Sequence, residues 1–363
     1  MIISAQSAVI AGQIRENITI TIDQGIITAV DSGNRSESER DYPGVLIPGF
    51  VDIHSHGGGG FYFSDPNPAH VNQAIATHRN AGTTSQIASL VTADISTLKD
   101  QIASLTPLVN SGALAGIHLE GPYLSSVKCG AHDPHLLRTP ALDEVKSLIE
   151  SGQGSIRMIT IAPELESAIE CIQWLTSQGI VVAIGHSDAD APTTRRAIDA
   201  GAQVVTHFSN AMSKYLSGES MASHVLGDSR IALELINDGV HVANDVIRTV
   251  VEKALQRTIL ITDAMSAAGS VDGKYSIGGL DVEVKDSIAR LTSNGALAGS
   301  TLTMEEAFMN FMKKDGVTLI DAVHASSTLP AQILKLEKVG SIAIGNKASI
   351  LHFYEEKIDL LTF

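Results

Sequence analysis

The chain has 363 residues, of which 44% are hydrophobic and 18% charged, with a mean hydropathy of +0.15. This composition is typical of a globular protein with an ample core, and it excludes a disordered or collagen-like polymer. The 25 Lys and Arg against 40 Asp and Glu leave a net charge of −15, which argues against nucleic acid or an anionic membrane as a partner.

The first residues and the cysteine content indicate the cellular compartment. Residues 1–12 (MIISAQSAVIAG) lack the basic segment and the sustained apolar stretch of a signal peptide. No apolar run in the chain approaches the roughly 20 residues that a membrane span needs. Two cysteines are too few for a disulfide framework and suit a reducing compartment. We therefore expect a cytoplasmic protein.

Both ends of the chain show short β patterns. Asn17–Ile22 (NITITI) alternates in polarity, Gln24 and Gly25 form a turn signal, and Ile26–Val30 continues as a strand. The tail after Glu337 returns to short strands. We predict that residues 1–47 and 336–363 together form a small β-sandwich domain, which flanks a larger domain of residues 48–335.

From Pro48 onward, apolar runs alternate with amphipathic helical stretches. The predicted strands are Gly49–Ile53, Thr83–Val91, Ala113–Leu119, Ile156–Ala162, Ile180–Gly185, Ala202–Thr206, Arg230–Ile236 and Thr258–Thr262. The predicted helices include Pro68–Asn80, Ile95–Val109, Leu142–Glu150, Glu164–Ser177, Ala191–Ala200 and Asn244–Leu255. Continuously apolar strands are typical of parallel sheets buried on both faces. Eight of them with intervening helices predict an α/β fold, a (β/α)8 TIM-like barrel, with an open doubly wound sheet as the alternative.

Histidines and carboxylates close five of these apolar runs. The first ends in His54-Ser55-His56 and the third in His118-Leu119-Glu120, while His186, His207 and Asp263 close the fifth, sixth and eighth. Side chains of a strand alternate with a period of two, so His54 and His56 point the same way. Active-site groups of a (β/α)8 barrel project from the carboxyl ends of its strands, and we expect this set to gather there.

The two carboxylates of this set indicate a bound cation. An unpaired Glu120 or Asp263 at the end of a buried strand would cost several kcal/mol, and a divalent cation removes that cost. Imidazole together with carboxylate oxygen suits zinc, iron or manganese. His118 shares the face of Glu120, where it either supports a ligand or simply packs.

Nine segments spread over almost the whole chain form a specific set of motifs. They are Pro48–Gly60 (PGFVDIHSHGGGG), Gly116–Leu124 (GIHLEGPYL), Gly130–Pro134 (GAHDP), Gly185–Ala189 (GHSDA), Thr206–Met212 (THFSNAM), Asp238–His241 (DGVH), Leu260–Gly269 (LITDAMSAAG), Leu297–Met304 (LAGSTLTM) and Gly340–Ala348 (GSIAIGNKA). In this order they resemble the amidohydrolase superfamily and, within it, the N-acetylglucosamine-6-phosphate deacetylases. The resemblance implies hydrolysis of the N-acetyl group of N-acetylglucosamine-6-phosphate, which yields glucosamine-6-phosphate and acetate.

The resemblance also implies a metal centre. Ring-opening members of the superfamily carry a carboxylated lysine between two metals, whereas Glu120 takes that position here. Glu120, His186 and His207 would hold the main metal. His54 and His56 vary in the family, and the presence of both suggests a second metal. We expect one or two divalent ions per subunit, zinc first, with iron, manganese or cobalt also suited to these ligands.

The same resemblance implies catalytic and substrate-binding roles. Asp263 would be the catalytic acid and base, and His132 would face the acetyl carbonyl. The residues that would contact the sugar or its phosphate are Ala131, Asn210, Ala211, His241, Leu297, Ala298 and Gly299. The family resemblance further implies a homodimer.

One family motif is missing. Members usually carry an Arg-Glu-Pro-Gly segment whose arginine reaches the sugar phosphate, but the corresponding stretch, Ser213–Ser223 (SKYLSGESMAS), contains no arginine. Lys214 is its only cation and could act as a point charge. The alternatives are therefore deacetylation of another N-acetyl amino sugar, such as galactosamine-6-phosphate or an unphosphorylated sugar, a D-aminoacylase-like N-acyl hydrolase, or a scaffold without catalytic activity.

Overall fold

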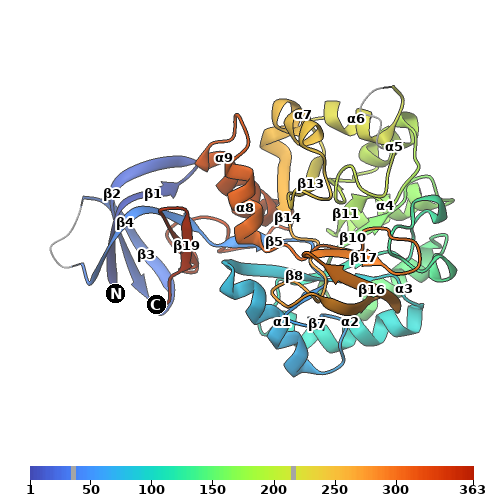
Figure 1. The fold of residues 1–363 in the computed structure, drawn as a ribbon, viewed down its shortest axis with the longest axis horizontal. Coiled ribbons are helices and arrows are strands. Elements are labelled where there is room, and N and C mark those ends of the chain that lie inside the picture. Colours follow the sequence, from blue (N-terminus) through green and yellow to red (C-terminus); the bar gives the residue numbers. More distant parts are fainter. Residues whose placement is uncertain (34–37, 214–217) are drawn as a thin grey trace.

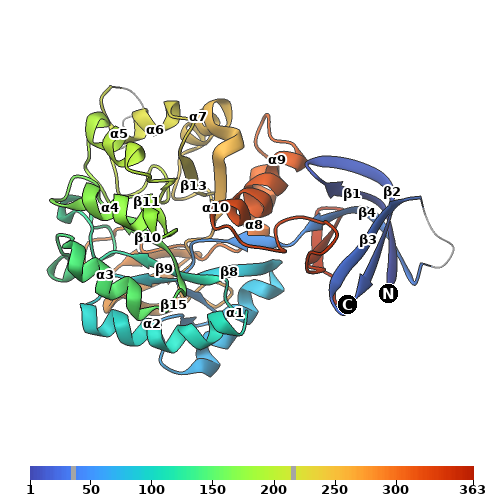
Figure 2. The ribbon, with the colours of Figure 1, turned by 180° about the vertical axis from the view of Figure 1, so that it is seen from behind.

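A computed structural model of the chain describes residues 1–33, 38–213 and 218–363. It contains a sheet built from both termini and a barrel of parallel strands surrounded by helices (Figure 1). Both chain ends lie in the terminal sheet. Helices α8 (Met304–Met312) and α9 (Leu319–Val323) lie between the sheet and the barrel in the front view and in the view from behind (Figure 2).

The barrel is an eight-stranded sheet in which every neighbouring pair is parallel. Its strands, in sheet order, are β5 (Phe50–Asp52), β8 (Thr83–Val91), β9 (Gly116–Glu120), β10 (Ile156–Ile161), β11 (Val181–Ile184), β12 (Val204–Val205), β13 (Ala232–Ile236) and β14 (Thr258–Ile261). Each overlaps one of the eight predicted apolar runs. The first and last strands meet at their carboxyl ends, where the Asp263 amide donates to the His54 carbonyl at 2.8 Å. The predicted barrel is therefore confirmed against the open sheet.

Helices follow most of the barrel strands, and their ends are set by local sequence. They are α1 (Pro68–Asn80), α2 (Ile95–Asn110), α3 (Leu142–Ser151), α4 (Ala168–Ser177), α5 (Ala191–Asp199), α6 (Met221–Gly227), α7 (Asn244–Ala254), α8, α9 and α10 (Leu329–Ile333), with short turns of helix at η1 (Ser126–Lys128), η2 (Pro134–Leu136), η3 (Leu255–Arg257) and η4 (His324–Thr328). Asp94, for example, caps α2 by accepting the Thr97 amide at 3.0 Å. Asn67 caps α1 in the same way, and Pro68 occupies its first turn.

The strands are mostly apolar because both of their faces are largely buried. In β10, Ile159 packs in the cluster that joins the strands to the surrounding helices, whereas Met158 packs in the cluster inside the barrel. In β14, Ile259 likewise belongs to the inner cluster and Leu260 to an outer one. Alternation of side chains along each strand thus fills two separate apolar layers.

The two termini form one six-stranded sheet. In sheet order its strands are β19 (Lys357–Leu360), β18 (Ile350–Tyr354), β4 (Arg40–Pro48), β1 (Ile2–Ile10), β2 (Gln13–Asp23) and β3 (Ile26–Ser32). Residues 345–348 also hydrogen-bond to Gly25 and Ile27 at the start of β3, so the sheet bends around its own apolar cluster. The predicted β unit from both termini is present, and its boundaries at residues 47 and 336 stay a prediction.

Two small sheets were not predicted. One is the hairpin β6 (Gly57–Gly58) and β7 (Phe61–Tyr62), and the other is β15 (Gly273–Ile277), β16 (Leu280–Lys285) and β17 (Ile288–Leu291). The second is inserted between β14 and α8, and it buries Ile277 and Val282 against Met265 from the loop after β14. Among the described residues, none of the helices combines the length and the apolar character needed to cross a bilayer.

Candidate functional site

Three of the predicted metal ligands meet at the carboxyl ends of β9, β11 and β12. The His186 and His207 Nε2 atoms each lie 3.1 Å from Glu120 Oε1, and they lie 3.0 Å from each other. Ligand atoms bound tetrahedrally at about 2.0–2.1 Å from one ion are separated by roughly 3.3 Å. The spacing of these three atoms therefore fits a single divalent ion.

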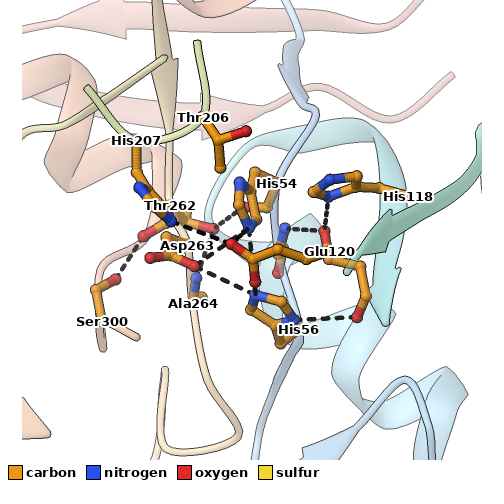
Figure 3. A network of polar contacts seen from close by, with 12 residues as sticks. His54, His56, His118, Glu120, Thr206, His207, Thr262, Asp263, Ala264 and Ser300 are labelled. Carbon is orange, nitrogen blue, oxygen red and sulfur yellow. Dashed lines mark hydrogen bonds and ion pairs between the residues drawn. The ribbon is translucent and has the colours of Figure 1, made fainter. Parts of the chain in front are cut away.

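His54, His56 and Asp263 form a second group on the other side of the Glu120 carboxylate. His56 Nε2 lies 3.2 Å from Glu120 Oε2 and 3.3 Å from Asp263 Oδ1. His54 Nε2 lies 3.3 Å from His56 Nε2 and 3.4 Å from Asp263 Oδ1. Figure 3 shows these side chains turned toward one another; they come from the segments that follow β5 and β14 and, for Glu120, from the end of β9. The donor set fits a second ion that shares Glu120 with the first.

Unusual backbone conformations place three of these side chains. His186, His207 and Asp263 have φ angles of 46°, 28° and 49°, in the left-handed region that residues other than glycine rarely adopt. Each is the second residue after the end of its strand, where the left-handed turn directs the side chain across the barrel mouth. Such strain is concentrated at functional sites and is maintained by the surrounding structure.

Hydrogen bonds to backbone carbonyls hold two of the imidazoles, those of His186 and His56, with their Nε2 atoms turned toward the carboxylates. His186 Nδ1 contacts the Lys128 carbonyl at 2.9 Å, and His56 Nδ1 contacts the Ser89 carbonyl at 3.1 Å. Because a carbonyl only accepts, each Nδ1 must carry the proton, and the unprotonated Nε2 can bind a metal. These contacts are therefore those expected of metal ligands.

Glu234 on β13 is a buried carboxylate that the sequence analysis did not single out. Its Oε2 atom lies 3.0 Å from His54 Nδ1 and accepts the His207 amide at 3.1 Å. The residue is fully buried. Glu234 thus joins one residue of each ligand group. The only signal in the sequence is a glutamate inside an otherwise apolar strand.

His118 lies beneath the ligands. Its Nδ1 contacts the Ser89 hydroxyl and its Nε2 contacts the Thr160 hydroxyl, both at 2.9 Å. The Thr160 hydroxyl in turn forms a hydrogen bond with the Thr206 hydroxyl at 2.8 Å. The ring packs against His54 with centroids 4.7 Å apart. Since both ring nitrogens are engaged by hydroxyls, His118 supports the site rather than binding an ion.

The electrostatics keep the carboxylates charged and His186 neutral, whereas the carboxylates raise the pKa of His54, His56 and His207 against the effect of burial. Burial raises the pKa of Glu120, but the neighbouring histidines, His54 foremost, hold that pKa well below its usual value. Burial also raises the pKa of Asp263, yet His54 and His56 bring it down to about 2. Burial and the nearby His132 lower the pKa of His186 to about 4. The ionised carboxylates and the neutral His186 are the forms that bind metal.

A cavity of about 350 Å³ opens over these groups. Of the predicted site residues, it is lined by His56, Glu120, Ala131, His132, His186, His207, Asn210, Ala211, His241, Asp263, Leu297 and Gly299. His54 is fully buried below it, and Ala298 is buried in the cluster under β15–β17. Lys214 lies outside the described residues. The structure therefore gathers all the predicted residues except Ala298 and Lys214 around one cavity and its floor.

The cavity also has lining residues that the sequence analysis missed. Val91 at the end of β8 and Ile277 at the end of β15 contribute apolar surface, and Gly130 and Ala296 complete the wall. Ile277 could not be anticipated because β15 was not predicted. His241 is held by Asp238, whose Oδ2 lies 2.6 Å from its Nδ1.

Comparisons with known proteins agree with this geometry. The model of the amidohydrolase family matches residues 45–359. An N-acetylgalactosamine-6-phosphate deacetylase of Escherichia coli O157:H7 is 36% identical over 92% of this chain and 89% of its own length. An N-acetylglucosamine-6-phosphate deacetylase of Vibrio furnissii is 31% identical over 96% of this chain and 89% of its own length.

Solved structures give the same result. A Mycobacterium smegmatis N-acetyl-D-glucosamine-6-phosphate deacetylase variant, in complex with N-acetyl-D-glucosamine-6-phosphate, superposes with a TM-score of 0.94 at 37% identity, covering 98% of this chain and 95% of that one. The corresponding Thermotoga maritima deacetylase has a TM-score of 0.88 at 31% identity, covering 98% and 96%. With its motifs, its barrel and these matches in agreement, the chain belongs to the amidohydrolase family.

Proposed function

We propose that this hydrolase removes the N-acetyl group of N-acetylglucosamine-6-phosphate, producing glucosamine-6-phosphate and acetate in amino-sugar catabolism. The observation that carries the proposal is the convergence of Glu120, His186 and His207 below an open cavity that Asp263 and His132 also line. Relatives named for this deacetylation match nearly the whole chain.

The metal centre of the proposed enzyme follows from the donor set. Glu120, His186 and His207 would hold the main ion, and His54 and His56 the second. A divalent ion held there lowers the pKa of a water molecule and polarises a carbonyl group. We propose zinc as the ion, with iron, manganese and cobalt as alternatives that the same ligands accept.

Asp263 is the proposed carrier of the proton. Its carboxylate is ionised, and its Oδ1 atom lies among the imidazoles at the cavity floor. As a base it accepts the proton of the attacking water, and as an acid it delivers that proton to the nitrogen of the breaking amide bond. Without this transfer an amide nitrogen is a very poor leaving group.

The proposed role of His132 is to stabilise the negative charge that develops on the acetyl oxygen. Its Nδ1 contacts the Thr92 hydroxyl at 2.8 Å, and its Nε2 lies 3.4 Å from Glu120 Oε2. A donor fixed in this position stabilises the oxyanion more than the substrate carbonyl, which lowers the barrier to attack.

The sugar and its phosphate would occupy the other side of the cavity, against Asn210, Ala211, His241 and the Leu297–Gly299 backbone. The galactosamine isomer is the second candidate substrate, because the E. coli relative at 36% identity is named for it. Cytoplasmic location, with the reduced Cys129 and Cys171, and a homodimeric state are further parts of the proposal.

Acetate release from three compounds tests the function. We expect kcat/KM to be highest for N-acetylglucosamine-6-phosphate, lower for N-acetylgalactosamine-6-phosphate and lowest for N-acetylglucosamine. A preference for the galactosamine phosphate would reassign the sugar, and a preference for the unphosphorylated sugar would remove the phosphate from the proposal. Absence of hydrolysis by metal-loaded protein would overturn deacetylation itself.

A further inference from the structure

A second cavity of about 370 Å³ lies beside the substrate cavity, and we call it the side chamber. The two cavities share His56 and Val91 as lining residues. The other lining residues of the side chamber come from β7 and the loop after it, the end of β8 and the residues after it, the first turns of α2, η2, and the end of β15 with the turn that follows it, among them Thr97, Gln101 and Gly278. Among the described residues, only His56 and Val91 line both cavities. The side chamber therefore adjoins the reaction centre at the carboxyl ends of β5 and β8.

Val91 and Ile277 form the partition between the cavities. Ile277 lines the substrate cavity, whereas its neighbours Ser276 and Gly278 line the side chamber. Val91 packs against the apolar cluster that contains Ile277. A Cβ atom added to Gly278 would lie 3.2 Å from Val91 Cγ2, so the hairpin turn leaves no room for a side chain beside Val91. The Tyr62 hydroxyl donates to the Ser276 carbonyl, which ties the hairpin to the barrel.

The order of strands in the barrel sets the direction in which the acyl group points. This step rests on the proposed function. Asn210 and His241, the proposed sugar contacts, follow β12 and β13, which lie across the ring of strands from β8 and β9. With the amide carbonyl between the metal ligands and His132, a sugar on the β12–β13 side leaves the acyl group directed toward the end of β8, at Val91.

Three hydroxyl groups of the chamber wall already have partners, whereas the Oε1 atom of Gln101 has none among the described residues and the Asp94 carboxylate also lines the wall. The Ser89 hydroxyl contacts His118, the Thr92 hydroxyl contacts His132, and the Thr97 hydroxyl donates to Asp94. An alkyl chain entering the chamber therefore leaves these groups paired. Breaking one of these three hydrogen bonds would cost free energy, and an alkyl chain does not compete for them.

We propose that Val91, together with Ile277, sets the acyl length that the enzyme accepts, and that the side chamber is a latent site for N-acyl chains of three or four carbons. The reaction is unchanged: the amide C–N bond breaks, the oxygen of water bonds to the acyl carbon, and the amine receives a proton. In the native chain the partition holds the acetyl methyl and excludes longer chains. Shortening Val91 joins the two cavities.

The test compares N-acetyl, N-propionyl and N-butyryl glucosamine-6-phosphate as substrates of the metal-loaded enzyme. Val91→Ala should raise the butyryl-to-acetyl ratio of kcat/KM by about tenfold or more, the range in which one or two methylenes change selectivity in an apolar pocket. Ile277→Val should raise the same ratio by a smaller factor. Val271→Ala is the matched control, because it removes the same methyl groups from a side chain that is 80% exposed, and its ratio should equal that of the wild type.

The outcomes separate this inference from the proposed function. An unchanged ratio in Val91→Ala with normal acetyl turnover overturns the role of Val91 and leaves deacetylation standing. An equal rise in Val271→Ala also overturns it, because the effect would then not depend on the partition. A wild type that hydrolyses none of the three amides overturns both. Where Val91→Ala folds poorly by circular dichroism, Ile277→Val carries the same comparison.

Discussion

Glu234 offers the sharpest test of how the barrel supports its metal ligands. Its Oε2 atom lies 3.0 Å from His54 Nδ1 and accepts the His207 amide at 3.1 Å, in a fully buried position. Glu234→Ala removes both contacts at once and leaves two buried donors without a partner. Each such donor costs about 1–3 kcal/mol, so the free energy of unfolding should fall by about 2–6 kcal/mol.

The same variant should bind metal less tightly. Partners that orient a ligating imidazole contribute about 10- to 100-fold in metal affinity, and Glu234 contacts one residue from each ligand group. Glu234→Gln keeps an acceptor oxygen of similar shape and should lie between the wild type and the alanine variant. Glu252→Ala on the exposed side of α7 is the control and should match the wild type.

The assay combines metal competition with a chromophoric chelator and urea unfolding of the metal-free protein. The chelator measurement reports orientation of the ligands, and the unfolding measurement reports the buried hydrogen bonds. A folded Glu234→Ala protein with wild-type metal affinity would refute the reasoning, because the carboxylate would then have no part in orienting His54 or His207.

Three further expectations follow from the site. Asp263→Asn should keep its main metal and lose about 10²- to 10⁴-fold in kcat, measured by acetate release, because it can no longer accept a proton; near-wild-type turnover would remove Asp263 from the mechanism. Burial lowers the pKa of His54, His56 and His207, but the neighbouring carboxylates raise it in the metal-free protein, to about 9 for His56. The pKa of His186 is lowered by burial to about 4. As pH falls from about 9, protons therefore compete with metal for both imidazoles of the second group, but for only one of the two in the main group. Metal content after dialysis should therefore drop from two ions toward one as pH is lowered, and equal loss from both groups would contradict this order. His241→Ala should raise KM for the sugar phosphate more than it lowers kcat, and an unchanged KM would place the phosphate elsewhere.

The barrel could be predicted because its signal is repeated and redundant. The barrel strands are mostly buried on both faces, so a run such as Ile180–Gly185 is apolar at every position and stands out from the helix that follows. The ligands could be predicted for the same reason, since a His, Glu or Asp at the end of such a run breaks its pattern. His186, His207 and Asp263 all occupy such positions, and the structure brings them together.

Other features could not be predicted because their cause lies in tertiary contacts. The strands β15 to β17 cover only one face, so their burial alternates over a few residues and resembles that of a loop. Ile277 and the partition with Val91 were missed with them. Glu234 lies two residues before the end of β13, so it does not appear among the polar residues that close the apolar runs.

The barrel residues that the sequence did not indicate as part of the site lie in one polar layer, between the apolar base of the barrel and the metal ligands. Ile87, Met158 and Ala232 belong to the inner apolar cluster, and two residues further along the same strands are Ser89, Thr160 and Glu234. Strand alternation makes both sets point inward.

This layer determines which charges the metal centre experiences. Buried polar groups are costly unless they are paired, and here Ser89 and Thr160 pair with His118 while Glu234 pairs with His54. Burial, with the adjacent His54, holds the pKa of His118 well below its usual value, so this imidazole stays neutral. A neutral His118 adds no positive charge beneath the ligands and leaves their negative charge available to a divalent ion. The layer thus orients the ligands and, at the same time, preserves the electrostatic attraction that binds the metal.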